Sequence, residues 1–358
     1  GNVTWCGALL IARSAPQADA GYPCEEVTLE EAGRLEPLLS AKALAAAEEA
    51  GLCFFHFPQE GHADPVAATQ ALAAQAEALG VEMMHGVEVT GFPYDQEGDV
   101  KGIRYRPLAG GQEEEVRADV VVLANGTGVA QLAARAGVRV PLVSRPGVLT
   151  RSVPAADVRL SKIVVSPELH VLQRRDGRLS VGESKETGGA SSVAHALQST
   201  HASETLSHEA AHEDGGERQS TTPGHGPEVG ARMMGSLRTL FSDKLFPSAG
   251  DLELEAVTLG WRPMPEDGLP IIGFVEGSCA TRPPSLYVAV MHSGITLGPV
   301  SGALIALEIV EGVNAAPLEP FRLSRASLRS KAGVIDTPAR AGRGRHAPAG
   351  GGGTYVVE

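Results

Sequence analysis

An arginine set among apolar residues is the first candidate for chemistry in this chain of 358 residues. Arg262 stands in the segment Gly-Trp-Arg-Pro (260–263), directly after a stretch that alternates like a strand. A guanidinium holds a carboxylate by two parallel hydrogen bonds, so Arg262 is a candidate for binding an acidic group of a ligand. The competing interpretation is an internal ion pair with Glu266 or Asp267.

A glycine-containing segment that leads into an apolar helix is the second candidate. Residues 292–298 read His-Ser-Gly-Ile-Thr-Leu-Gly and follow a buried apolar run. Free N–H groups at a helix N-terminus and the helix dipole favour negative charge. Gly294 and Gly298 allow a ligand to approach the backbone closely. His292 either donates a hydrogen bond to the ligand or caps the turn.

A turn of small residues at the end of a buried strand is the third candidate. The run 116–123 ends in Ala124-Asn125-Gly126. The last four residues of this run, 120–123, are all apolar, which indicates a strand that is covered on both faces. Because open α/β sheets bind ligands beyond the carboxyl ends of their strands, this turn is a candidate for contact with a ligand.

Composition limits the class of protein. The chain has 30 Lys and Arg against 43 Asp and Glu, and the resulting charge of −13 argues against nucleic acid as a partner. Its four cysteines form no CxxC pair and the five histidines between 195 and 225 have no ligand spacing, so we expect no metal site. Reduced cysteines and the absence of a signal-peptide pattern favour a cytoplasmic protein. Turn residues interrupt the uncharged stretch 283–307, so we expect no membrane span.

Hydrophobic periodicity predicts strands that alternate with helices. The helix at 65–79 has the clearest signals, because Asp64 suits its cap, Pro65 its first turn and Gly80 its end. Other helices are predicted at 129–136, 229–245 and 299–310. Strands are predicted at 7–12, 53–57, 81–84, 87–92, 100–105, 116–123, 138–153, 252–259 and 286–290, with a hairpin at 169–173 and 178–182. This order fits an α/β domain interrupted by an α+β domain.

Four segments together resemble one family, the FAD-dependent oxidoreductases of the D-amino-acid oxidase (DAO) class. They are FFHFPQEGHADP (54–65), DVVVLANGTG (119–128), LGWRPMPEDGLPIIG (259–273) and VMHSGITLGPVSG (290–302). The last two are the most specific, and LEPFRLSR (318–325) matches the usual end of the domain. Met291 stands where the family usually has glycine. Glycine oxidase, sarcosine oxidase and D-amino-acid dehydrogenase subunits are members that the chain resembles.

The resemblance implies FAD as the cofactor, a small amine or amino acid as the substrate, and O₂ or another electron acceptor. Hydride would pass from the substrate α-carbon to flavin N5 and leave an imine. Arg262 would bind the substrate carboxylate, and His292 would belong to the catalytic site. The implied cofactor contacts are Val87, Val89, Ala124, Asn125, Gly126, Ser293, Gly294, Ile295, Thr296 and Leu297. For the two valines the competing interpretation is that they only pack within their sheet.

The implied fold is an incomplete FAD-binding Rossmann-like domain with an interleaved antiparallel-sheet substrate domain. The FAD-binding part comprises 61–137 and 284–325. The substrate part comprises 1–60, which includes linker helices, 138–194 and 231–283. The acidic, His- and Ser-rich insertion 195–230 and the tail 326–358 contain little core material, and we expect both to be disordered.

The sequence lacks the GxGxxG unit that cradles the pyrophosphate in this family. Gly126-Thr-Gly128 supplies only the first two glycines, and residue 1 is Gly rather than Met. We therefore expect that the chain belongs to a longer protein, and that these 358 residues alone retain FAD weakly or not at all. The alternative is a divergent, non-catalytic relative that binds no FAD and acts as a binding or scaffold protein.

Overall fold

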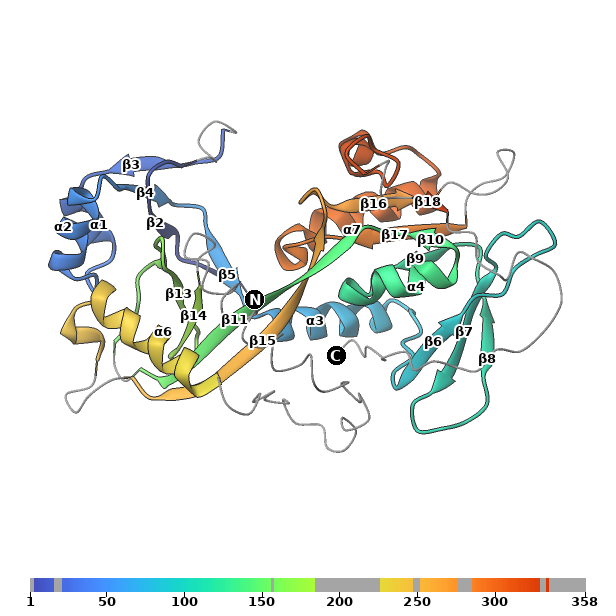
Figure 1. The fold of residues 1–358 in the computed structure, drawn as a ribbon, viewed down its shortest axis with the longest axis horizontal. Helices are drawn as coiled ribbons and strands as arrows, with labels where there is room; N and C mark the ends of the chain where they lie inside the picture. Colours follow the sequence, from blue (N-terminus) through green and yellow to red (C-terminus); the bar gives the residue numbers. More distant parts are fainter. Residues whose placement is uncertain are drawn as a thin grey trace. The chain divides into compact units, whose positions relative to one another are not determined.

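The computed structural model describes residues 3–15, 21–155, 158–183, 226–246, 252–275, 285–328 and 333–334. The chain divides into two compact units: unit 1 is Gly1–Gly80 with Pro146–Gly260, and unit 2 is Val81–Arg145 with Trp261–Glu358. Two of the boundaries fall inside long strands, β11 (Leu142–Pro154) and β15 (Leu254–Pro265) (Figure 1).

Unit 1 is built on a large, mostly antiparallel sheet. Besides β11 and β15, its strands are β2 (Ala8–Ala12), β3 (Glu25–Val27), β4 (Cys53–Phe57), β12 (Ile163–Val165), β13 (Leu169–Gln173) and β14 (Arg178–Glu183). The strand order is β15-β11-β14-β13-β12-β2-β4-β3. From β11 to β3 all neighbours are antiparallel except β12 and β2. A separate pair joins β1 (Val3–Trp5) to β5 (Gly61–Ala63).

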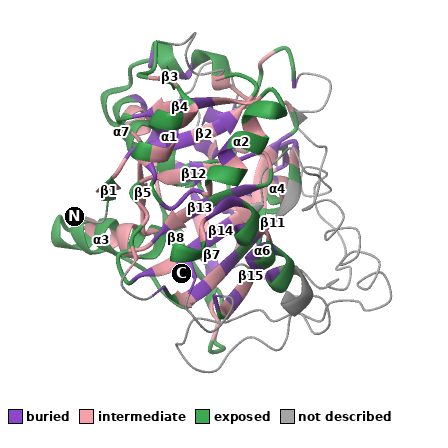
Figure 2. Cartoon of the chain, turned by 90° about the vertical axis from the view of Figure 1, so that its left-hand side faces the viewer, coloured by how far each residue is buried: buried purple, intermediate pink, exposed green. Residues whose placement is uncertain are grey.

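Helices of unit 1 bury the apolar residues on one face of this sheet. They are α1 (Leu29–Leu35), α2 (Ala41–Glu49) and α6 (Gly226–Leu240), followed by the short η4 (Asp243–Leu245) (Figure 1). Figure 2 shows buried residues along the central strands. The largest core cluster combines strand residues such as Leu9, Val171 and Leu179 with Met233 and Leu237 of α6. Each such side chain contributes about 1.5–3 kcal/mol when it is fully buried.

Helix α3 (Pro65–Ala78) of unit 1 starts where the sequence predicts. Asp64 Oδ1 accepts a hydrogen bond from the Ala67 N–H at 3.0 Å, and Pro65 occupies the first turn. None of its residues is buried, and Leu72 is 65% exposed. The local signals therefore predict the helix, although Leu72 on it and Leu79 at its end stay exposed within the described chain.

Unit 2 contains two three-stranded sheets. One has the order β16 (Ile271–Phe274), β17 (Leu286–Val290), β9 (Val121–Leu123), and the other has β6 (Val87–Gly91), β7 (Gly102–Pro107), β8 (Glu114–Arg117). β10 (Val138–Arg139) pairs with β18 (Gly333–Val334). The helical elements are η2 (Gly126–Gly128), α4 (Val129–Arg135), α7 (Gly294–Glu311) and η5 (Ala316–Phe321).

Helix α7 is apolar on more than one face. Leu304, Ile305 and Ile309 pack with the cluster around Tyr287, while Ile295 and Val310 are exposed. Among the described helices it alone has the length and apolar composition of a membrane span, which by itself is weak evidence. Its buried Glu308 is hydrogen-bonded to groups of unit 2.

Several predicted boundaries are wrong. α7 begins at Gly294 rather than Pro299, so the predicted loop 292–298 is largely the first turns of a helix, and Pro299 lies inside it. The run 116–123 is split, because its first part pairs with β7 and its last part with β17. Residues 81–84 are exposed and form no strand.

Two segments that we expect to be disordered contain described structure. α6 begins at Gly226, so the end of the insertion predicted at 230 is wrong. In the tail 326–358, Leu328 is fully buried against a core cluster of unit 2 and Val334 pairs with Val138, so the tail does not begin at 326. Residues 195–225 and the rest of the tail lie outside the described residues.

The two units group some residues differently from the predicted domains. Residues 61–80 belong to unit 1 although we assign 61–137 to the FAD-binding part, and 261–275 belong to unit 2 although we assign 231–283 to the substrate part. Which unit serves which ligand stays a prediction.

A buried carboxylate ties the end of α7 to the rest of unit 2. Glu308 accepts hydrogen bonds from the Tyr287 hydroxyl at 2.6 Å, from the Ala315 N–H at 2.9 Å and from both terminal nitrogens of Arg322. Burial would raise the pKa of Glu308, but the bonds from Arg322 and Tyr287 outweigh it and the pKa is lowered. Glu308 is therefore a charged anchor that joins α7, β17 and the segment around η5.

A second arginine–carboxylate pair fixes the turn after β15. Both carboxylate oxygens of Asp267 accept hydrogen bonds from Arg325 at 2.6 Å, and the Ser327 hydroxyl donates to Oδ2 at 2.5 Å. These bonds hold the pKa of Asp267 far below its usual range. Arg325 also donates to the carbonyl groups of Leu269 and Pro270, so it closes the whole turn.

Replacing Asp267 by Asn should destabilise the protein by about 3 kcal/mol at pH 6, because it leaves a largely buried arginine without its counter-ion. The lowered pKa means that this stability is present above pH 4 and is lost as the pH falls toward the folded-state pKa. The difference in the free energy of unfolding between wild type and Asp267→Asn should therefore be about 1 kcal/mol smaller at pH 3 than at pH 6. Urea unfolding at both pH values measures it. The exposed Asp119→Asn is the control, and equal losses in the two variants would refute the role of the pair.

Candidate functional site

Two predicted cofactor turns emerge at the same edge of the β16-β17-β9 sheet. β9 and β17 are parallel, with Val121 beside Leu286 and Leu123 beside Val288. Both strands therefore end in the same direction. The structure thus brings the turn Ala124–Asn125–Gly126 and the segment from His292 to Leu297 to one edge of unit 2, as expected for a ligand site at the carboxyl ends of parallel strands.

The second turn enters α7 through a strained residue. Ser293 has φ 61°, the only positive φ of a non-glycine residue in the described chain. Its hydroxyl lies 2.7 Å from His292 Nδ1 and does not cap the helix. Gly294 opens the helix directly after it. The first N–H groups of α7, those of Gly294, Ile295 and Thr296, therefore have no side-chain cap, and this end of the helix favours an anionic ligand group.

The first turn carries a buried oxygen that lacks a donor. Asn125 Oδ1 has no hydrogen-bond partner within the described residues. A buried acceptor without a partner costs about 1–3 kcal/mol. A ribose hydroxyl is a suitable donor, so the residue fits contact with the sugar of a nucleotide cofactor.

Space is available for a ligand at the N-terminus of α7. A Cβ atom built on Gly294 or Gly298 would meet no atom within 4 Å. Together with the uncapped helix end and Asn125, this open space fits the flavin and ribose parts of FAD. Among the described residues, the strand-to-helix turn between β9 and α4 supplies only Gly126 and Gly128 of the GxGxxG unit that would cradle its pyrophosphate.

Val87 and Val89 lie elsewhere in unit 2. Both are half-buried residues of β6, in the other three-stranded sheet. Arg135, at the last turn of α4, donates to the Val89 carbonyl at 3.2 Å. α4 begins next to Gly128, so Val89 is at the far end of this helix from the Asn125 turn. The adenine contact stays a prediction, and so does sheet packing.

Arg262 is a half-buried residue of β15. One of its two competing ion-pair partners is already engaged, because Asp267 is bound by Arg325. The Glu266 N–H donates a hydrogen bond to the Pro141 carbonyl at 3.2 Å. The Arg262 guanidinium therefore stays a candidate for binding a carboxylate. No hydrogen bond joins it to His292 within the described part of the chain.

The sequence analysis missed the residues that hold the site together. Glu308, Arg322 and Arg325 position α7 and the turn after β15. A signal was present, since Glu308 is an acidic residue inside the apolar run 299–310 and the two arginines lie in the motif LEPFRLSR. Pattern reasoning does not pair residues that are far apart in the chain.

Several curated proteins are similar in sequence to this chain. The chain is 27% identical to the bifunctional protein ThiO/ThiG of Nostoc over 76% of its own length and 34% of that protein. It is 26% identical to glycine oxidase of Geobacillus kaustophilus over 85% of its length and 67% of the relative. The chain thus spans about a third of the ThiO/ThiG proteins it matches.

Solved structures share the fold. Glycine oxidase from Geobacillus kaustophilus superposes with a TM-score of 0.63 at 22% identity, over 90% of this chain and 76% of the other. L-proline dehydrogenase from P. horikoshii superposes with a TM-score of 0.61 at 17% identity, over 89% and 76%.

The family itself is defined by sequence over most of the chain. Residues 2–307 match the DAO family, described as FAD dependent oxidoreductase. This match includes both turns at the edge of the β16-β17-β9 sheet, Arg262 on β15 and the first fourteen residues of α7. The chain therefore belongs to the DAO family of FAD-dependent oxidoreductases.

Proposed function

We propose that this chain is part of an enzyme that uses FAD to oxidise a small amine or amino acid. One observation carries the proposal most directly: the family's flavin-contacting segment forms the uncapped N-terminus of α7, beside a turn whose Asn125 oxygen lacks a donor. A positive helix end and an unpaired acceptor at one sheet edge are suited to a reduced flavin and its ribose.

Each part of the proposed site has a physical role. When bound, FAD supplies the group that accepts hydride from the substrate α-carbon. The N–H groups of α7 stabilise negative charge at that edge. Arg262 holds the substrate carboxylate with two hydrogen bonds and so orients the α-carbon. An amine that binds deprotonated needs no general base from the chain.

The names of the relatives support a small amine or amino acid as the substrate. They include a glycine oxidase and a D-amino acid dehydrogenase of Methylobacterium radiotolerans, 27% identical to this chain. Oxidases and dehydrogenases differ in the electron acceptor, so the proposal extends to O₂ or another acceptor. Glycine, sarcosine, proline-like and D-amino acids are all candidate substrates.

A non-catalytic binding protein is the second candidate. It is favoured by the open side of β9, which pairs only with β17 within the described chain and leaves Val122 42% exposed. A protein of this kind would keep the fold and bind no flavin.

Titration of FAD into the 358-residue chain should show weak binding, because no described segment cradles the pyrophosphate. Replacing Asn125 by Ala should weaken that binding about fivefold, the effect of one lost hydrogen bond of about 1 kcal/mol. Quenching of flavin fluorescence measures the dissociation constant. The control is Gln131→Ala on the exposed side of α4. Equal affinities in wild type and Asn125→Ala would refute the contact.

Replacing Arg262 by Ala should raise KM for amino acids about 100-fold, because about 3 kcal/mol of charged hydrogen bonding to the carboxylate is lost. Uncharged amines have no carboxylate, so their KM should change little. Arg262→Lys should restore part of the loss, and the exposed Arg139→Ala should change neither substrate class. Steady-state assays of the flavin-loaded protein give these constants. An equal rise for both substrate classes would rule out carboxylate binding by Arg262.

A further inference from the structure

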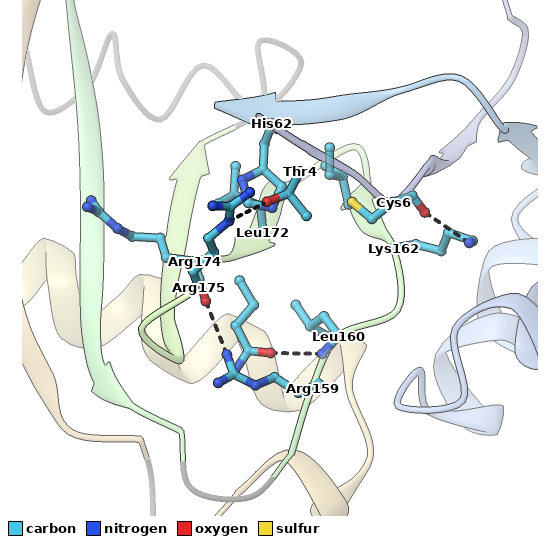
Figure 3. A pocket seen from close by; sticks show the side chains of 11 residues that line it. Thr4, Cys6, His62, Arg159, Leu160, Lys162, Leu172, Arg174 and Arg175 are labelled. Atoms are coloured by element: carbon cyan, nitrogen blue, oxygen red, sulfur yellow. Dashed lines mark hydrogen bonds between the residues drawn. The ribbon is translucent and has the colours of Figure 1, made fainter. Parts of the chain in front are cut away.

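A basic pocket in unit 1 is the strongest feature that the proposed function does not use. Its volume is ≈160 Å³, enough for about five water molecules. Four cationic side chains line it, Arg159, Lys162, Arg174 and Arg175, and no carboxylate does (Figure 3). In a chain with a net charge of −13, such a group of cations is a local exception.

One of the four cations already has acidic partners. Arg174 forms an ion pair with Asp64 at 2.5 Å and lies 3.8 Å from Asp176. Asp64 is also the cap of α3, so this pair fixes the start of that helix against the β13–β14 hairpin. Arg174 is therefore a structural residue of the pocket wall.

The other three cations, Arg159, Lys162 and Arg175, donate hydrogen bonds only to neutral groups among the described residues, although Lys162 also interacts electrostatically with the buried Glu36. At 2.9–3.2 Å they donate to the carbonyl groups of Arg174, Cys6 and Val3 and to the Thr4 hydroxyl. A guanidinium has five N–H donors, and Arg159 uses one and Arg175 two in these bonds. Most of their donors are thus available to a ligand.

Two buried side chains hold the loop that carries Arg159 and Lys162. Glu36 is fully buried, and its Oε2 accepts hydrogen bonds from the Ser161 N–H at 2.7 Å and the Lys162 N–H at 2.9 Å. Gln173 accepts from the Leu160 N–H at 2.9 Å. The backbone of this loop is therefore fixed before any ligand binds, which lowers the entropic cost of binding.

The pocket wall also contains a histidine, His62, whose pKa is lowered. Burial, followed by the nearby Arg175 and Arg174, lowers the pKa of His62 below its ordinary value. His62 is therefore neutral at pH 7. A neutral imidazole adds one donor and one acceptor to the wall without adding a further positive charge.

We propose that this pocket binds a small oxyanion, a phosphate or a short carboxylate. Figure 3 shows Arg175 beside Thr4 and His62 on one side of the pocket and Arg159 on the other. Guanidinium groups match the paired oxygen atoms of these anions, which a chloride ion lacks. The aliphatic side chains of Leu160 and Leu172 complete the wall.

Calorimetric titration of the full chain tests the proposal. Sodium phosphate and sodium malonate are added separately, with ionic strength held constant by sodium chloride. At least one of the two anions should bind saturably, at one site per chain. The anion that binds shows whether the pocket takes a phosphate or a carboxylate. Arg159→Gln and Arg175→Gln should each weaken binding at least tenfold. Both side chains belong to exposed residues, and circular dichroism checks that the variants fold.

The control is Arg34→Gln, an exposed arginine of α1 in the same unit, which pairs with Glu30 at 3.9 Å. It should bind the anion as wild type does. The proposal is overturned if neither anion binds saturably, or if the two pocket variants bind no more weakly than Arg34→Gln. The candidate flavin residues belong to unit 2, whereas the pocket belongs to unit 1. The pocket proposal can therefore fail while the proposed function holds, and the proposed function can fail while the pocket binds an anion.

Discussion

The parallel pairing of β9 with β17 is the constraint on which the candidate site depends. Strands 165 residues apart in sequence run side by side, with Tyr287 next to Val122, so the turns that follow them open at one edge. Without this strand pairing, nothing would place Asn125 and Ser293 at the same edge of the sheet. Tyr287 also donates its hydroxyl to Glu308, so the strand that sets the register is bonded to the helix that carries the segment from Gly294 to Leu297.

Buried arginine–carboxylate pairs hold α7 and the turn after β15 in place within unit 2. Arg322 holds Glu308 on α7, and Arg325 holds Asp267 in the turn after β15. Breaking one partner of such a pair leaves an uncompensated charge, which costs far more than the pair itself contributes. The pair at Asp267 has a further consequence, because it takes up the carboxylate that would otherwise be a candidate partner of Arg262. Two residues at the end of the family motif thus support both predicted contacts, the flavin edge and the carboxylate ligand.

Local signals in the sequence predict local structure well and long-range structure poorly. The cap at Asp64 and the turn at Arg175–Asp176–Gly177 lie within a few residues of the elements they define, so α3 and the β13–β14 hairpin are confirmed almost to the residue. The start of α7 is wrong because Ser293 adopts a left-handed conformation that its residue type does not signal. The sequence predicts one strand over 116–123, yet tertiary pairing divides this segment between two sheets.

The same distinction applies to the sites. Motif order predicts that the Asn125 and Ser293 turns belong together, whereas the basic pocket is lined by residues from 4–6, 62 and 159–175, which no single motif links. Anaerobic addition of substrate to the FAD-loaded protein, expressed from the initiating methionine of its gene, tests the central claim most directly. We predict that glycine, sarcosine, L-proline or D-alanine bleaches the visible flavin absorbance. A protein that stays colourless with excess FAD, or a bound flavin that none of these compounds bleaches, would contradict the account.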